Sequence, residues 1–259
     1  MNFQQKDIDD LKKAKNLLEN PGIAVKIINS FGCPIEKGFK LLPANWNMKV
    51  AQITQEALTK AVHTAVFTMK DLPGEESSNI WHKIAAAATG SIGGFFGLTA
   101  LAAELPISTT IMLRSIADIA RSEGERISDI KTKIACIEVF ALGGPAQNDD
   151  TFESGYFTIR ASLAQSITKA AEYISEKGMT DEIAPALVRL IIQIAERFSI
   201  QVSEKVAAQA IPAIGAAGGA IINTLFIDHF QDMARGHFIV KRLERKYGKN
   251  LVESTYKTI

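Results

Sequence analysis

The chain has 259 residues, enough to bury a sizeable hydrophobic core in one large domain or two small ones. Its 29 Lys and Arg residues nearly balance 28 Asp and Glu residues, which excludes a general electrostatic attraction to nucleic acid. The chain has two cysteines, Cys33 and Cys136, and no CxxC motif, which excludes a disulfide framework and a common type of zinc site.

The first expected helix, residues 3–19, lies in a polar and charged segment. A secretory signal would need an apolar core behind a basic start, so we expect a cytoplasmic protein.

Apolar residues recur at intervals of three and four along most of the chain, and alternation is rare, which predicts an all-α, multi-helix bundle. After residues 3–19, helices are expected over 21–42 with a break near Cys33-Pro34, then over 47–69, 78–103, 106–122, 126–142, 154–177, 179–203, 204–226 and 228–247. Turn residues predict linkers at 71–74 and 143–155. We expect a single helical domain over 1–259, with an N-terminal helical lobe over 1–70 as the alternative.

A glycine-rich stretch, "ATGSIGGFFGLTALAAELP" at residues 88–106, raises the question of a phosphate loop. A dinucleotide site needs GxGxxG after a strand, and a P-loop needs Lys-Ser/Thr after its glycines. Neither pattern is present, and the preceding residues are alanine-rich and helical in character, so a nucleotide site is not expected.

Two long runs lack any charge: residues 84–103, with 20 residues, and residues 206–227, with 22 residues. Both are long enough to cross a bilayer. Their small residues, with few Leu and Phe, favour close helix packing in a soluble body, and a membrane-inserting hairpin is the alternative.

The two runs repeat one pattern, GxxGGxxxxT, from Gly90 to Thr99 and from Gly215 to Thr224. Glycines four apart lie on one helix face and let a partner backbone approach closely. Each helical glycine costs about 1 kcal/mol relative to alanine, a cost that tight contact would offset. We therefore expect two central glycine-rich helices packed together.

Several segments resemble the EcsC family. They are "NPGIAVKIINSFGCPIEKGFKLLP", "GSIGGFFGLTALAAELPISTTIMLRSIADIARSEGE", "FALGG", "GYFTIRASLA" and "IPAIGAAGGAIINTLFIDHFQDMARGHFIVKRLERKYG". The resemblance covers residues 10–248. It implies a bacterial helical protein on the cytoplasmic side, suggests membrane association by analogy with a relative encoded beside an ABC transporter, and brings no established catalytic residue.

A polar stripe follows Pro106, a residue that suits the first position of a helix. Thr110, Arg114 and Asp118 are spaced four apart, with Arg121 three residues later, so their side chains share one helix face. Because apolar residues flank it, the stripe is expected to face other polar groups inside the protein or to line a cleft. The alternative is an ion-pair network in which Arg114 pairs with Asp118 or Glu104.

A second polar cluster lies in "DHFQDMARGHF", residues 228–238. His229 and Asp232 share a helix face with His237 at its edge, a set compatible with a metal ion, although no specific ligand motif occurs. The candidate metal ligands are therefore His229, Asp232 and His237. The candidate catalytic groups are Glu104, Asp118, His229 and Asp232. The candidate ligand-binding side chains are Thr110, Arg114, Arg121 and Arg235.

Nucleophilic catalysis finds less support, because no GxSxG elbow occurs and Cys136 lies in an apolar segment typical of a core. The basic segment "KRLERKYGK", residues 241–249, could meet anionic lipid headgroups at about 1 kcal/mol per basic residue. The alternative is a solvated helix end, where positive charge complements the helix dipole.

Three functions follow from these patterns. The first is a non-enzymatic protein that engages a lipid or the membrane surface, with Arg114 or the basic tail steering an anionic head. The second is a metal- or water-activating hydrolase that uses the candidate catalytic groups. The third is a scaffold without a small ligand, which would act through a protein partner. No resident cofactor and no nucleic acid partner are expected, and the oligomeric state stays open.

Overall fold

The computed structural model describes residues 3–19, 22–68, 98–143, 155–177 and 185–259, and these residues form helices without strands. The all-α prediction is thus confirmed. The helices, in chain order, are α1 (Gln5–Leu18), α2 (Ile23–Phe31), α3 (Glu36–Phe39), α4 (Trp46–Thr68), α6 (Leu98–Ser122), α7 (Ile130–Glu138), the 3₁₀ turn η1 (Val139–Ala141), α8 (Gly155–Lys177), α9 (Pro185–Ala210), α10 (Pro212–Tyr247) and α11 (Lys249–Thr258).

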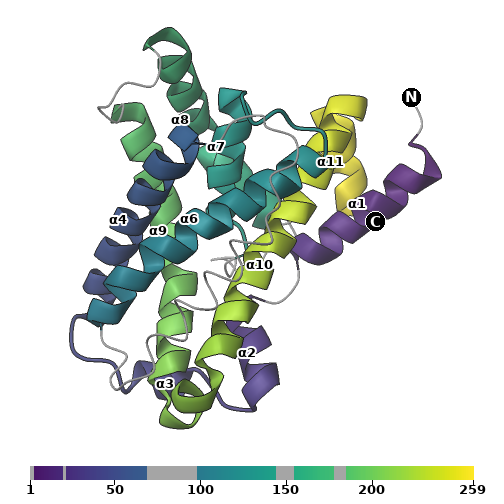
Figure 1. Cartoon of the computed structure of the whole chain (residues 1–259). Helices are drawn as coiled ribbons and strands as arrows, with labels where there is room; N and C mark the ends of the chain where they lie inside the picture. The colour runs from purple at the N-terminus through teal and green to yellow at the C-terminus, as the bar shows by residue number, and fades with distance from the viewer. Residues whose placement is uncertain (1–2, 20–21, 69–97, 144–154, 178–184) are drawn as a thin grey trace.

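The long helix α10 organises the bundle. It contacts α1, α2, α6, α9 and α11, and it runs from the α9–α10 turn at one end of the molecule to α11 and α1 at the other, as Figure 1 shows. Helices α6 and α9 pack against α4 on the other side. α4, within the alternative N-terminal lobe, therefore packs into the same body as the later helices.

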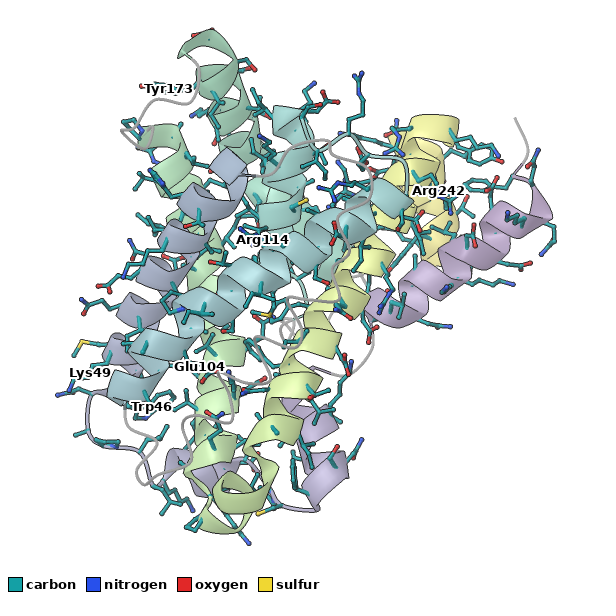
Figure 2. The ribbon with its side chains drawn as sticks, in the orientation of Figure 1. Trp46, Lys49, Glu104, Arg114, Tyr173 and Arg242 are labelled. Carbon is teal, nitrogen blue, oxygen red and sulfur yellow. The ribbon has the colours of Figure 1, made fainter. Side chains whose placement is uncertain are left out.

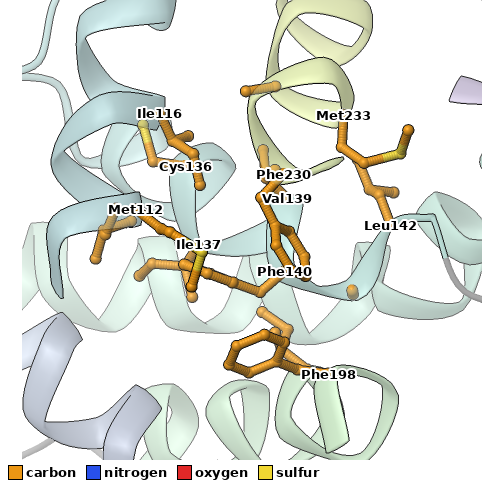
Figure 3. Packing of buried hydrophobic residues seen from close by; sticks show 14 of the residues in the cluster. Met112, Ile116, Cys136, Ile137, Val139, Phe140, Leu142, Phe198, Phe230 and Met233 are labelled. Carbon is orange, nitrogen blue, oxygen red and sulfur yellow. The ribbon is translucent and has the colours of Figure 1, made fainter. Parts of the chain in front are cut away.

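Aromatic side chains fill the centre where α9, α10 and η1 meet (Figure 3). The ring of Phe140 lies 4.9 Å from that of Phe198 and 5.3 Å from that of Phe230, measured between centroids. Phe226 adds a ring 5.2 Å from Phe230. All four rings are buried, and aromatic pairs at such distances stabilise a core beyond the area that they bury.

Two helix ends differ from prediction because of proline. Pro106 was expected to begin a helix, but it lies inside α6, which already runs from Leu98. Pro212 begins α10, so α9 continues to Ala210 and the expected break at 203–204 does not exist. A proline at the first helical position loses no hydrogen bond, because that N–H has no partner within a helix.

Other ends agree with the sequence patterns or were missed. The break near Cys33-Pro34 is confirmed, since α2 ends at Phe31 and Gly32 follows in the left-handed conformation at φ +63°. The separation expected after residue 226 is absent, because α10 continues to Tyr247. Helix α11 was not predicted; Gly248, at φ +85°, separates it from α10.

The first glycine repeat, residues 90–97, lies outside the described residues, so the packing of two glycine-rich helices stays a prediction. In the second repeat, Gly218 faces α2: a Cβ added there would lie 2.8 Å from the Phe31 ring. The closest backbone approach in the described chain is at Gly38, where a Cβ would lie 1.9 Å from the carbonyl oxygen of Ala207. Helices α3 and α9 therefore meet at a position that only glycine fits.

Membrane crossing was the alternative for the two uncharged runs, and residues 84–97 of the first run lie outside the described residues. None of the described helices is both long and apolar enough to span a bilayer.

Candidate functional site

The predicted polar stripe lies along α6, and its members do not form one site. Thr110 donates a hydrogen bond to the carbonyl oxygen of Pro106 within its own helix. Asp118 pairs with Arg121 three residues later, and both side chains are about a third exposed or more. Arg114, labelled in Figure 2, forms no ion pair with another described residue, so its predicted pairing with Asp118 or Glu104 is absent.

The predicted metal ligands do not converge. Among the described residues, no three His, Cys, Asp or Glu side chains lie close enough together to hold a metal ion. On α10, at 100° per residue, Asp232 and His237 point about 140° apart, and His229 and His237 are about 12 Å apart along the helix axis. The structure therefore does not form the expected His229–Asp232–His237 cluster.

Asp232 belongs instead to a surface network with α2. Its two carboxylate oxygens accept hydrogen bonds from Lys26 at 3.2 Å and from Arg235 at 3.1 Å. These groups are partly exposed, and an ion pair of this kind contributes about 0–1 kcal/mol. Two of the candidate residues, Asp232 and Arg235, thus lie side by side as an ion pair.

His237 joins a buried polar network between α7, α8 and α10. Its Nδ1 lies 3.0 Å from the hydroxyl of Tyr156, and its Nε2 lies 3.7 Å from a carboxylate oxygen of Glu138. Arg160 donates two hydrogen bonds to Glu244, at 2.8 and 2.9 Å. All five side chains are largely buried, so this network ties three helices together.

Burial shifts the pKa values of this network in opposite directions. It raises the pKa of the Glu138 carboxyl, an effect that Arg160 partly offsets. It lowers the pKa of His237 well below its usual range, with a further decrease from Arg160. In the tautomer with its proton on Nε2, a neutral His237 accepts a hydrogen bond from the Tyr156 hydroxyl at Nδ1, and Nε2 is buried without a hydrogen-bond partner among the described residues.

A second set of buried polar groups lies on one face of α9. Gln201, Lys205 and Gln209 are spaced four apart and are nearly inaccessible to solvent. Residues at this spacing lie one above the other on a helix. The Lys205 side chain is only 1% exposed.

The partner of Lys205 is Glu104 of α6, one of the predicted catalytic candidates. Lys205 Nζ donates to the Glu104 carboxylate at 2.6 Å and lies 4.9 Å from the centre of the Phe226 ring on α10. Three helices thus meet at this ammonium group. A lysine is buried in this way only when its charge is compensated, here by a carboxylate and an aromatic face.

The facing surface of α10 continues the polar pattern. Phe226 contacts Lys205, and Asn223 and His229 lie one turn before and one turn after it, about 60° to either side of Phe226. We call the polar members of the two facing surfaces the α9–α10 ladder: Gln201, Lys205, Gln209, Asn223 and His229.

Polar atoms of the ladder are buried without a partner. Within the described part of the chain, Gln201 Oε1, Gln209 Nε2 and Asn223 Oδ1 have no hydrogen bond, and the ring nitrogens of His229 have none of good geometry, although the Gly143 backbone lies beside the ring. Buried polar groups in native proteins are nearly always hydrogen-bonded, to protein, water or ligand. The ladder therefore holds several of the buried polar atoms that have no partner within the described residues.

His229 lies at one end of the ladder, against η1. Gln201 donates to the carbonyl oxygen of Leu142 at 2.7 Å, and the next residue, Gly143, has φ +78°. A Cβ at Gly143 would lie 2.5 Å from His229 Nε2, so only glycine leaves room for the ring. Desolvation lowers the pKa of His229 to about 4, with Lys26 adding to the decrease.

The candidate catalytic groups thus have separate surroundings. Glu104 pairs with Lys205, Asp118 with Arg121, and Asp232 with Lys26 and Arg235, whereas His229 has no such partner. Cys136 is buried, and burial raises the pKa of its thiol to about 12, which agrees with its interpretation as a core residue.

Comparison with known proteins identifies the family. The model of the EcsC protein family matches residues 5–243, which is most of the chain. The protein belongs to the EcsC family. No curated protein and no solved structure matches the chain. The segments whose resemblance pointed to EcsC include Gly143, Arg160 and the α10 histidines, which contribute to the two buried polar sites.

Sequence reasoning found only part of the ladder. It identified His229, and also Glu104, the partner of Lys205, but it missed Lys205, its two glutamine neighbours and Asn223. Their signal is present in "QVSEKVAAQ", where Gln201, Lys205 and Gln209 recur every four residues beside an uncharged run. The expected helix end at residue 203 divided this pattern between two helices and hid it.

Proposed function

We propose that this EcsC-family protein is non-enzymatic and engages anionic lipid at a membrane surface. The observation that supports the proposal is an exposed apolar and basic segment between α3 and α4. We call it the 37–49 corner.

The 37–49 corner combines the two features of an interfacial segment. It contains three exposed lysines, Lys37, Lys40 and Lys49, and no Asp or Glu. Leu41 and Met48 are 57% and 68% exposed, which is unusual for large apolar side chains in one short segment. Lysines around apolar side chains are typical of segments that lie in the headgroup region of a bilayer.

An aromatic pair supports the same interpretation. Trp46 stacks on Phe39 with ring centres 5.3 Å apart, and both side chains are partly buried. Trp46 and Lys49 lie at the start of α4, as Figure 2 shows. Tryptophan is favoured at the boundary between apolar and polar phases, because its ring is large and its N–H needs a polar partner.

The corner lies at the end of the molecule where α9 turns into α10. Gly38 packs against Ala207 of α9, and Phe31 of α2 packs against Gly218 of α10. Residues 206–227, which form this turn, carry no charge, and Ile221 is 48% exposed. No acidic side chain of this turn would therefore oppose approach to an anionic surface.

The basic tail is less suited to this role than the sequence suggested. Lys246 pairs with Asp7 at 2.7 Å, Arg242 with Asp10 at 2.8 Å, and Arg245 with Glu125. Cations that are already paired attract headgroups less, since their carboxylate partners would repel the same phosphates. The three lysines of the corner form no ion pair with any described residue.

Co-sedimentation with lipid vesicles tests the proposal. The chain should bind vesicles that contain phosphatidylglycerol and not those of phosphatidylcholine alone. Each lysine contributes about 1 kcal/mol near an anionic surface, so the variant with Lys37→Glu, Lys40→Glu and Lys49→Glu should bind about a hundred-fold more weakly.

The matched control reverses three exposed lysines of α1, with Lys6→Glu, Lys12→Glu and Lys13→Glu. It changes the net charge equally and leaves the corner intact, so its binding should fall far less. If vesicle binding fell equally in both variants, the loss would reflect only the net charge. That result would overturn the assignment of the 37–49 corner as the membrane-binding surface. No binding by the unmodified chain would overturn the function.

A further inference from the structure

The Lys205–Glu104 pair is asymmetric. Lys205 is 1% exposed, whereas Glu104 is 33% exposed, so the carboxylate lies toward the surface and the ammonium lies beneath it. Lys205 is the last charged residue before the uncharged run 206–227. An ammonium group has three N–H donors, and the described contacts use one of them, on Glu104.

A second buried donor lies beside it. Gln209, one turn further along the same face of α9, is 8% exposed, and its Nε2 has no acceptor among the described residues. A charged and a neutral donor on adjacent turns can bind two oxygens of one carboxylate or phosphate group. Hydrogen bonds to such an ionised acceptor are about twice as strong as those between neutral groups.

The surroundings favour a ligand with an apolar part. Phe226 contacts Lys205, and Ile222, one turn earlier on the same face of α10, is fully buried. A small hydrated anion would lose its water here without covering apolar surface, which is costly. An anionic head with an alkyl chain satisfies both kinds of surface.

We propose that Lys205 and Gln209 bind the carboxylate or phosphate head of a single-chain amphiphile, and that Glu104 occupies Lys205 when no such head is bound. The ligand's anionic oxygens replace the Glu104 carboxylate on Lys205 Nζ and accept the free Gln209 N–H. This inference rests on the proposed function, because the ligand is again an anionic lipid. The Lys205 site is distinct from the 37–49 corner.

Calorimetric titration with dodecanoate, below its micelle concentration, tests the site. Substitutions at its two charged residues should change the affinity for dodecanoate in opposite directions. Lys205→Met should weaken binding about ten-fold or more, because it removes the charged donor. Glu104→Gln should strengthen binding about ten-fold, because the competing carboxylate is neutralised. Gln209→Leu should weaken binding by a smaller factor, and Gln55→Leu, on the exposed side of α4, should leave it unchanged.

A loss of stability could weaken dodecanoate binding but would not strengthen it, so the stronger binding expected for Glu104→Gln separates the site from an effect on stability. If Lys205→Met does not fold, Glu104→Gln and Gln209→Leu still decide the outcome. A purely structural ion pair would predict weaker or unchanged binding in Glu104→Gln, and that result would overturn the site. The site would also be overturned if uncharged dodecanol bound as tightly as dodecanoate, because the anionic head would then contribute nothing. It would likewise be overturned if inorganic phosphate bound as tightly as dodecanoate, because the alkyl chain would then contribute nothing.

The two proposals fail separately. Charge reversal at the 37–49 corner should weaken vesicle binding about a hundred-fold and leave dodecanoate affinity unchanged. Loss of vesicle binding with intact, Lys205-dependent dodecanoate binding would overturn the membrane surface alone. Vesicle binding without any dodecanoate binding would overturn the Lys205 site alone.

Discussion

The first half of α10, residues 212–229, carries no charge before Asp228, whereas the second half, residues 230–247, carries cations that pair with acids from other segments. In the first half, Asn223 Oδ1 is buried without a hydrogen-bond partner in the described chain, and the ring nitrogens of His229 have none of good geometry. In the second half, Glu244 accepts two hydrogen bonds from Arg160, and Nε2 of His237 is buried without a hydrogen-bond partner among the described residues.

This difference separates a structural part of the helix from a part able to bind. Satisfied buried networks fix the arrangement of helices, and removing one partner leaves an uncompensated charge. A buried polar group without a partner costs about 1–3 kcal/mol, a cost that water or a ligand hydrogen-bonded to it would offset. We therefore expect substitutions in the second half to cost stability, and those along the ladder to change ligand binding.

The largest effect should come from Arg160→Met, because Arg160 of α8 is the partner of Glu244 in the second half of α10. It removes the partner of Glu244 and the nearest cation to Glu138, both nearly buried. Loss of one member of a buried network costs about 3–5 kcal/mol. Urea denaturation of the variant should show that decrease in the free energy of unfolding.

Arg126→Ala is the matched control for Arg160. Its pair with Asp129 lies at 3.4 Å between side chains that are 79% and 50% exposed. Exposed pairs contribute about 0–1 kcal/mol, so the free energy of unfolding should hardly change. Similar costs for Arg160→Met and Arg126→Ala would contradict a structural role for the second half.

The next effect is the pH dependence contributed by His229, at the boundary between the halves. Burial lowers its pKa from 6.5 to about 4, so between these pH values the unfolded chain binds a proton that the folded chain does not. Stability from this group is complete above about pH 6.5 and is lost as the pH falls, by about 3 kcal/mol in total.

His229→Gln should therefore flatten the plot of unfolding free energy against pH over that window, by about 1.4 kcal/mol per pH unit. The measurement is urea denaturation at several pH values, with His63→Gln, at an exposed position on α4, as the control. If the slope of His229→Gln equals that of the unmodified chain, the imidazole is not buried in a neutral state.

The smallest of these effects is expected where Gly38 of α3 packs against Ala207, near the turn between α9 and α10. Gly38→Ala places a Cβ against the backbone oxygen of Ala207, which cannot move as a side chain can. Such overpacking costs about 1–3 kcal/mol, measured as a lower midpoint of denaturation. Gly22→Ala, whose Cβ would lie 3.5 Å from the nearest atom, should change the midpoint little.

The helical fold could be read from the sequence, because apolar spacing reports which face of a helix is buried. Helix ends at Pro106 and Pro212 were misplaced, since a proline permits both a kinked helix and a new start, and only tertiary packing decides between them. The α6 stripe was predicted as one site because helix spacing shows which residues share a face. It does not show which helix lies opposite.

The same limit explains the candidate site. Glu104 was found because a carboxylate beside an uncharged run is conspicuous, but its partner Lys205 comes from a helix 101 positions later in the chain. The basic tail was overestimated for a related reason. Its neutralising acids, Asp7 and Asp10, lie at the opposite end of the sequence, on α1.

Fluorescence of Trp46 tests most directly whether the 37–49 corner meets anionic lipid. The difference between the emission spectra of the unmodified chain and of Trp46→Phe isolates this residue, with and without phosphatidylglycerol vesicles. The account predicts that the isolated emission shifts to shorter wavelength and is quenched by brominated lipid. Vesicle binding with neither change at Trp46 would place the membrane contact elsewhere and contradict the account.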